Sequence, residues 1–135
     1  MFSTKIQIRF SDCDMLNHVN NAIYLQYFET ARIHFLTSEL PEWDWNEQGI
    51  ILANNNIDYL KPLFLTDECH ITVFCTKIGQ SSFTLGYHVF VKNSEEQILK
   101  SKGESVLVCF NFKTSQKMTI PENLLKILKK SKSTL

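Results

Sequence analysis

The sequence predicts an α+β domain in which a five-stranded antiparallel sheet is wrapped around one long central helix. Apolar and polar residues alternate near the N-terminus, and the apolar spacing then becomes helical. Four further strand-like runs follow, joined by short connections. Short connections favour antiparallel neighbours, because parallel strands need a crossover of a dozen or more residues. With 135 residues, the chain is expected to form a single domain over residues 1–135.

The first strand is expected over about residues 4–10, where Ile6, Ile8 and Phe10 alternate with polar residues. The long helix is expected over about residues 21–38. Its apolar arc is wider than a surface helix needs, so we expect the sheet to curl around it and cover most of its circumference. The arc consists of Ile23, Tyr24, Tyr27, Phe28, Ala31 and Phe35.

The segment after the helix, residues 39–49, contains Pro41 and two tryptophans, Trp43 and Trp45. We expect a loop here that either covers a pocket or tucks its two indole rings against the helix end. The other four strands are expected over residues 50–60, 68–78, 82–93 and 97–112.

The run 82–93 indicates how the sheet packs, because its alternate residues are apolar. This pattern predicts one packed face and one largely solvated face. A short final helix is expected over residues 121–128, with Pro121 at its start and lysines near its end, where cations suit the helix dipole. The apolar face of the run 82–93 consists of Phe83, Leu85, Tyr87, Val89 and Val91.

Composition excludes several function classes. The 14 basic residues balance 14 acidic ones, so there is no excess positive charge for nucleic acid. No apolar run reaches the roughly 18 residues of a membrane span, and the N-terminal segment lacks the apolar core of a signal peptide. We therefore expect a cytoplasmic protein. The four cysteines are expected to be reduced thiols. The chain has no Cys-x-x-Cys pair, so we do not expect a zinc ribbon.

The most reactive stretch of the sequence runs from Asp12 to Tyr24, at the entrance of the long helix. It gathers two aspartates, a histidine and three asparagines, where a helix cap needs a single polar side chain. A helix N-terminus offers free backbone N–H groups and a positive dipole end, which stabilise a carbonyl oxygen that is becoming negative. We therefore expect the active site here.

Two separated motifs resemble those of a known family. The first runs from Asp14 to Arg32, and the second from Asn54 to Asp67. A strand, a long helix and a run of antiparallel strands is also the order of a hotdog domain. The chain resembles, over nearly its whole length, the hotdog acyl-CoA thioesterases of the 4-hydroxybenzoyl-CoA thioesterase superfamily, and among them the bacterial long-chain acyl-CoA thioesterase III group. The matching residues are His18-Val19-Asn20-Asn21, Tyr24, Tyr27, Glu29, Ala31 and Arg32, then Asn54-Asn55-Asn56-Ile57-Asp58-Tyr59-Leu60-Lys61-Pro62 and Thr66-Asp67.

The resemblance implies roles for the residues at the helix entrance. Asp14 aligns with the catalytic carboxylate of the family, which acts either as a nucleophile through an acyl-enzyme anhydride or as a general base for water. Backbone N–H groups around Asn20, Asn21 and Ala22 would polarise the thioester carbonyl. Asp12 is the other aspartate, and it is expected to cap a turn or to face solvent.

His18 has two interpretations. It follows Asp14 by four residues, the interval at which the similar plant acyl-carrier-protein thioesterases carry a catalytic histidine. Those enzymes also place an asparagine two residues after the aspartate, where this chain has Leu16. His18 therefore either assists the reaction directly or orders the loop through a backbone hydrogen bond.

The resemblance also implies the partners. The substrate is expected to be an acyl-CoA, with acyl-carrier protein as a possible donor, and Tyr24 and Lys61 are expected to contact it. Asn56, which alternates with Asn54 and Asp58 on one face of its strand, is expected either to line the pocket and contact the substrate or to cross a subunit boundary. Lys61 and the lysines after Lys117 are the candidates for the CoA phosphates. No metal and no bound cofactor are expected, since coenzyme A is part of the substrate. In the family the site lies between two subunits, so we expect a homodimer or homotetramer.

Two other functions start from the same residues. Asp12-x-Asp14 after a strand resembles the nucleophile motif of haloacid-dehalogenase-type phosphatases, and with His18 it would suit a divalent metal. That fold, however, needs a buried parallel strand and further βα units. The other alternative is a hotdog protein that binds an acyl-CoA or acyl-carrier protein without cleaving it, as a sensor or assembly subunit. Asp14 argues against this alternative, because binding alone does not need it.

Overall fold

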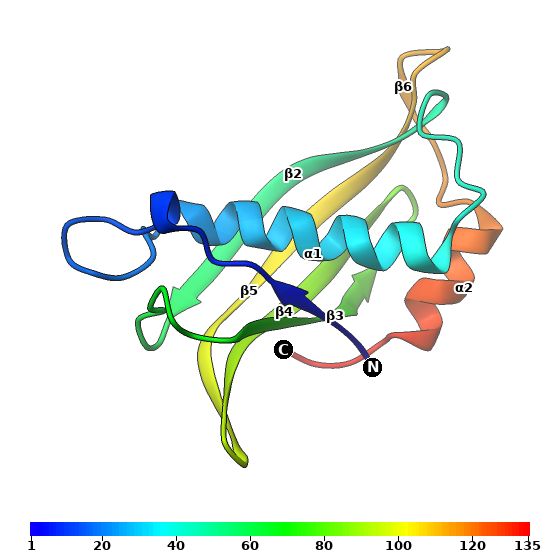
Figure 1. Cartoon of the computed structure of the whole chain (residues 1–135). Helices are drawn as coiled ribbons and strands as arrows, with labels where there is room; N and C mark the ends of the chain where they lie inside the picture. Colours follow the sequence, from blue (N-terminus) through cyan, green and yellow to red (C-terminus); the bar gives the residue numbers. More distant parts are fainter.

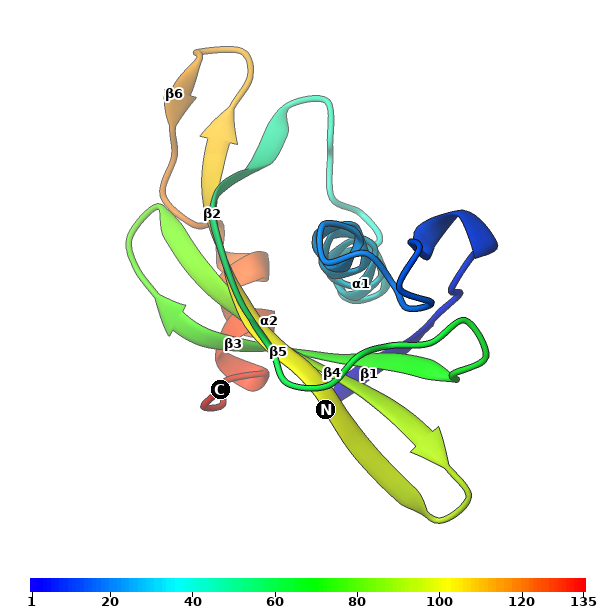
Figure 2. The same cartoon turned by 90° about the vertical axis from the view of Figure 1, so that its left-hand side faces the viewer.

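The computed structural model describes all 135 residues as an antiparallel sheet with one long helix on its concave face (Figures 1 and 2). The strand order is β1-β3-β4-β5-β2, with β6 added beside β5, so the sheet has six strands. This is the α+β hotdog arrangement that the sequence predicts. The elements are β1 (Phe2–Ile6), a 3₁₀ turn (Phe10–Asp12), α1 (Ile23–Glu39), β2 (Gln48–Tyr59), β3 (Cys69–Ile78), β4 (Ser82–Asn93), β5 (Glu96–Asn111), β6 (Gln116–Lys117) and α2 (Glu122–Lys130).

Most predicted boundaries agree with the structure to within two residues, but two details were wrong. The first strand ends at Ile6 rather than near residue 10, because its partner β3 begins at Cys69, which pairs with Ile6. The sheet also has a sixth strand, since the chain turns back after β5 and pairs Lys117 with Phe110. Because every strand pair is antiparallel, the parallel sheet of the phosphatase alternative is absent.

α1 is buried on one side only. Its apolar side chains pack onto the concave face of the sheet, and Figure 2 shows the helix end-on inside this curve. The opposite side is exposed, as at Thr30 and His34, so the expectation that the sheet covers most of the helix was wrong for a single chain. The buried residues of α1 are Tyr24, Tyr27, Phe28, Ala31, Arg32, Phe35 and Leu36.

The convex face of the sheet is more buried than its sequence pattern predicts. The apolar face of β4 is buried under α1, which confirms half of the prediction. On the other face, however, Phe90 is also buried and Phe74 of β3 is fully buried. A Cβ at Gly86 would lie 2.6 Å from the Phe74 ring, so the absent side chain lets this ring lie against the sheet. This close approach buries Phe74 on the convex face, where the sequence pattern predicted a solvated side chain.

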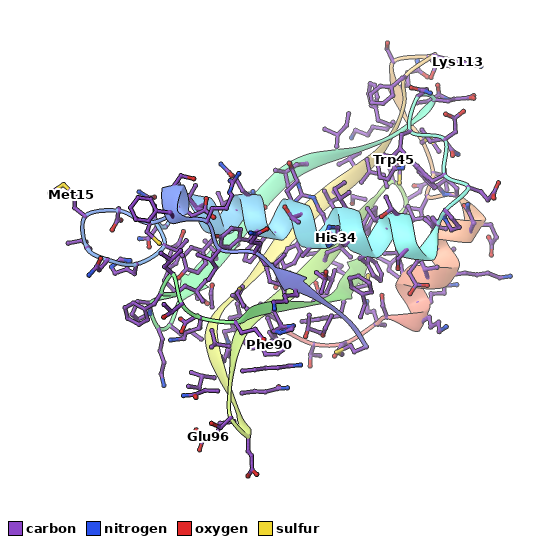
Figure 3. All side chains as sticks on the ribbon, viewed as in Figure 1. Met15, His34, Trp45, Phe90, Glu96 and Lys113 are labelled. Carbon is purple, nitrogen blue, oxygen red and sulfur yellow. The ribbon has the colours of Figure 1, made fainter.

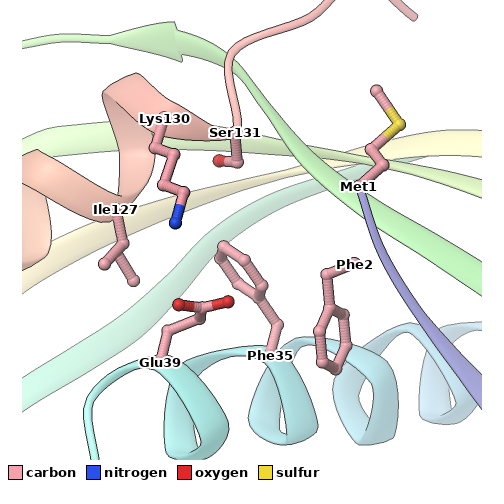
Figure 4. Close-up of a pocket in the computed structure, with 7 residues that line it drawn as sticks. All are labelled: Met1, Phe2, Phe35, Glu39, Ile127, Lys130 and Ser131. Atoms are coloured by element: carbon pink, nitrogen blue, oxygen red, sulfur yellow. The ribbon is translucent and has the colours of Figure 1, made fainter.

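The far end of α1 holds a cavity of about 390 Å³ (Figure 4). Phe2, Phe35 and Ile127 form its apolar walls, and Glu39 and Lys130 lie at its polar side. The loop after α1 buries Trp43, whose Nε1 donates to the Gln48 carbonyl at 3.0 Å, whereas Trp45 is 38% exposed, so only one of the two indole rings is buried. Neither helix is long and apolar enough to cross a membrane.

Candidate active site

A closed loop, residues 13–19, projects from the N-terminal end of α1, with Met15 at its exposed tip (Figures 1 and 3). Its two ends pair: the Asp14 amide donates to the His18 carbonyl at 3.1 Å, and Cys13 and Val19 form an antiparallel bridge. Asn17 has a φ of 68° and its amide donates to the Asp14 carbonyl. Asparagine tolerates this left-handed conformation better than most residues, so the local sequence suits the turn.

Asp14 is half-buried on this loop, and its carboxylate is only partly engaged. Oδ1 accepts a hydrogen bond from the Leu16 amide at 2.9 Å, while Oδ2 makes no hydrogen bond within the chain. One carboxylate oxygen is therefore oriented by the loop and the other is available to a substrate or a water molecule. This arrangement suits either a nucleophile or a general base.

Asp12 differs sharply from Asp14, because it is only 1% exposed. Its carboxylate accepts hydrogen bonds from the Tyr27 hydroxyl at 2.5 Å, from the Arg9 amide at 3.0 Å and from Arg9 Nη2 at 3.3 Å. Burial raises the pKa of Asp12, but these hydrogen bonds outweigh it and hold the pKa below the usual range. Asp12 does cap the 3₁₀ turn, whereas the alternative that it faces solvent was wrong.

The three backbone amides that the sequence offers for the carbonyl oxygen are not equivalent. The Asn20 amide donates to the Asp12 carbonyl at 2.9 Å, and the Ala22 amide donates to the Asn20 side chain at 3.0 Å. The Asn21 amide makes no hydrogen bond within the chain. No side chain caps α1, whose N-cap residue is Ala22. The Asn21 amide comes directly before this residue, so it lies at the positive end of the helix dipole. The structure thus singles out Asn21 among the three as a free donor.

Tyr59, at the end of β2, holds the peptide group that follows the Asn21 amide. Tyr59 was not among the predicted site residues, yet its hydroxyl donates to the Asn21 carbonyl at 2.8 Å. Its ring meets Tyr24 edge-on, with 5.0 Å between the ring centroids. The Tyr24 hydroxyl in turn accepts a hydrogen bond from the Leu63 amide at 3.2 Å, and burial raises the pKa of Tyr24 to about 12. Alternation along β2 placed Tyr59 on the helix face, which is a signal that the sequence did contain.

A cavity of about 200 Å³ opens at this point. It brings together four of the predicted residues, which are His18, Asn21, Tyr24 and Lys61. His18 Nδ1 lies 3.3 Å from the Val19 carbonyl oxygen, which is a backbone contact of the kind that one of its two interpretations expects. Tyr59, Leu60 and Pro62 complete the lining.

The remaining predicted residues lie outside this cavity. Asp14, Asn20 and Ala22 belong to the adjoining loop and turn and do not line it. Asn56 is not brought to the helix entrance, because its register with Glu104 places it on the convex face of the sheet. Its neighbour Asn55 faces α1 instead and accepts a hydrogen bond from Ser105 at 2.6 Å.

Neither thiol chemistry nor a clustered metal site is evident elsewhere in the chain. Burial raises the pKa of Cys69 to about 12 and that of Cys109 to about 11, which disfavours their thiolates. The four cysteines are free, and three of them are buried core residues, as predicted. No group of three or more His, Cys, Asp or Glu side chains is arranged to hold a metal ion.

Comparison with known proteins identifies the family. The model of the thioesterase-like superfamily matches residues 8–128. FadM, a long-chain acyl-CoA thioesterase of Escherichia coli (strain K12), is 28% identical over 124 residues, which are 90% of this chain and 92% of FadM. YsmA of Bacillus subtilis (strain 168) is 36% identical over 87 residues, 64% of this chain and 58% of YsmA, so that match spans less than two thirds of the relative.

A solved structure supports the same assignment. A thioesterase of Thermus thermophilus, complexed with coenzyme A and Zn, is 30% identical, with a TM-score of 0.80. The match covers 95% of this chain and 91% of that one. The family model, the sequence relatives and the solved structure therefore indicate the same family as the order of elements and the two sequence motifs. The chain belongs to the thioesterase-like superfamily.

Proposed function

We propose that this protein hydrolyses an acyl-CoA thioester to the free carboxylic acid and CoA, at the entrance of α1. Membership of the thioesterase-like superfamily makes the chain a thioester hydrolase. The choice of acyl-CoA as substrate is supported by two relatives: FadM is a long-chain acyl-CoA thioesterase, and the Thermus thermophilus structure holds coenzyme A.

The observation that carries the proposal is the free Asn21 amide beside the loop that presents Asp14. In our proposal this N–H and the positive end of α1 bind the thioester oxygen, which becomes negative as the carbonyl carbon turns tetrahedral. The Tyr59 hydroxyl holds the Asn21 carbonyl and so fixes the orientation of the neighbouring peptide groups. The donor is thus oriented before the substrate binds, which is the requirement for electrostatic stabilisation of a transition state.

Asp14 carries the attack in one of two ways. As a general base it takes a proton from water, and the water oxygen then bonds to the carbonyl carbon. As a nucleophile it bonds to the carbonyl carbon itself, giving a mixed anhydride that a water molecule hydrolyses in a second step. In both routes the C–S bond breaks with its electron pair on sulfur, and the CoA thiolate takes up a proton. In our proposal His18, whose Nδ1 lies 3.3 Å from the Val19 carbonyl oxygen, assists this proton transfer.

The substrate contacts follow from the cavity. Tyr24 and the exposed Lys61 both line it, and we propose that Lys61 meets a phosphate of CoA. Acyl-carrier protein remains an alternative donor, since its arm presents the same thioester. The acyl pocket itself is proposed to include a second copy of the chain, as in the family. The edge strand β2 lacks a partner on one side and exposes Ile51 and Leu52, which a second copy would cover.

The test is release of free thiol across a panel of acyl-CoAs, comparing the wild type with Asp14→Ala. We expect turnover by the wild type and a loss of orders of magnitude in the variant, with acyl-CoA binding retained. Binding by the wild type without turnover on every substrate would favour the non-catalytic sensor or assembly subunit. The acyl chain that gives the highest kcat/KM then identifies the preferred substrate.

A further inference from the structure

The most buried charged side chain near the site has no part in the proposed chemistry. Asp12 is 1% exposed, and a buried carboxylate is costly unless it is fully paired. Its partners are unusually complete, with the Tyr27 hydroxyl and the Arg9 amide on Oδ2 and the Arg9 guanidinium on Oδ1. Such an arrangement needs a reason, because an apolar residue would fill the same space without the desolvation cost.

The connections of Asp12 show what it holds. Asp12 directly precedes the loop 13–19, and its carbonyl accepts the amide of Asn20, the residue directly after that loop. Its carboxylate is tied to Tyr27, which is 4% exposed and sits in the second turn of α1. One residue therefore holds both ends of the loop and fixes them to the body of the helix.

This geometry couples the two reacting groups of the proposed site. Asp14 lies two residues after Asp12, and the free Asn21 amide lies one residue after the Asn20 amide that Asp12 accepts. A shift of Asp12 away from α1 would displace the carboxylate and the carbonyl-binding amide together. Displacements of about 1 Å at reacting groups can cost 10²-fold in rate.

We propose that Asp12 and Tyr27 are positioning residues, whose hydrogen bond holds the Asp14 loop at the distance from the helix entrance that the reaction needs. This inference rests on the proposed function, because it assigns these residues a task in that reaction. Neither side chain contacts the substrate. Both act through the loop, so their removal should lower kcat much more than it changes KM.

The decisive variant is Tyr27→Phe, which keeps the buried ring and removes only the hydroxyl that donates to Asp12. The matched control is Tyr87→Phe, which also removes one hydroxyl from a fully buried ring, but a hydroxyl that makes no hydrogen bond to Asp12 or to the loop 13–19. We expect Tyr27→Phe to lower kcat about 10- to 100-fold, with KM within about two-fold of wild type, and Tyr87→Phe to leave both unchanged. Asp12→Asn, which keeps the shape but not the charge, should show the same split.

Amide hydrogen exchange supplies a readout that a purely structural role would not give. In Tyr27→Phe, exchange should accelerate over residues 13–21 and stay at the wild-type rate in β3, β4 and β5. An unchanged kcat, an equal loss in Tyr87→Phe, or acceleration spread evenly over the sheet would overturn the positioning role. If the wild type itself turns over no acyl-CoA, it is the proposed function that fails, so the two failures are distinguishable.

Discussion

Gly103 determines how closely α1 approaches the sheet, and its replacement by alanine gives a stability prediction that the structure quantifies. Gly103 lies on β5 between Ile57 and Tyr87 of the neighbouring strands, on the face that carries α1. A Cβ there would lie 2.5 Å from the Asn56 carbonyl oxygen and 2.7 Å from a ring carbon of Phe28. Ordinary contacts of a Cβ begin at 3.4 Å, so the new atom would intrude by roughly 1 Å.

Relief of this clash has to come from the backbone or the helix. The carbonyl oxygen is part of the sheet, and Phe28 is fixed because it stacks on Tyr87 with 4.2 Å between the ring centroids. We therefore expect Gly103→Ala to lower the free energy of unfolding by about 3 kcal/mol, the upper end of the usual cost of overpacking. For a chain of this size that corresponds to a fall in Tm of roughly 10 °C.

Urea unfolding and thermal melts at a fixed protein concentration measure this effect, since any association would also shift Tm. The matched control is Gly79→Ala in the exposed turn between β3 and β4, where the nearest atoms to a Cβ are 3.1 Å away. We expect this control to cost less than about 1 kcal/mol. If Gly103→Ala is no more destabilising than Gly79→Ala, the claim that Gly103 determines how closely α1 packs on the sheet is refuted.

Three further predictions concern the site. Tyr59→Phe removes the hydrogen bond to the Asn21 carbonyl, and it should lower kcat about 10-fold; equal kcat in steady-state assays would contradict this role. Lys61→Ala should raise KM for an acyl-CoA but not for the acyl-N-acetylcysteamine thioester, which lacks the phosphates; an equal rise for both would exclude a phosphate contact. Because the pKa of Asp12 lies below its ordinary value of 3.8, its stabilising effect is complete above about pH 4 and is lost as pH falls further. Asp12→Asn should therefore lose less stability than the wild type as pH falls below about 4 in urea titrations, and an equal loss would contradict this assignment.

The sequence predicts the fold well because periodicity reports burial directly. The change from alternating to helical spacing located α1 and the long strands to within two residues. It could not locate β6, because Gln116–Lys117 is held only by pairing with β5 and has no periodic pattern of its own. The end of β1 was missed for the same reason, since it is set by where β3 begins.

The site was predicted less completely, because residue type does not reveal which groups are already engaged. Asp12 and Asp14 are chemically identical in the sequence, and only the fold shows that one is buried against Tyr27 and the other half-buried on a loop. Likewise, the sequence offered three adjacent amides, two of which are used within the chain. Asn56 was assigned to the substrate, but its register places it on the convex face of the sheet.

The most direct test of the account measures turnover and affinity together in Asp14→Asn. This variant keeps the size of the side chain and an oxygen that can accept the Leu16 amide, so the loop should retain its form. We predict that thiol release at saturating acyl-CoA falls about 10³-fold or more, while the Kd for the same acyl-CoA stays within a few-fold of wild type. Turnover at the wild-type rate in Asp14→Asn would contradict the central claim that this carboxylate carries out the attack on the thioester.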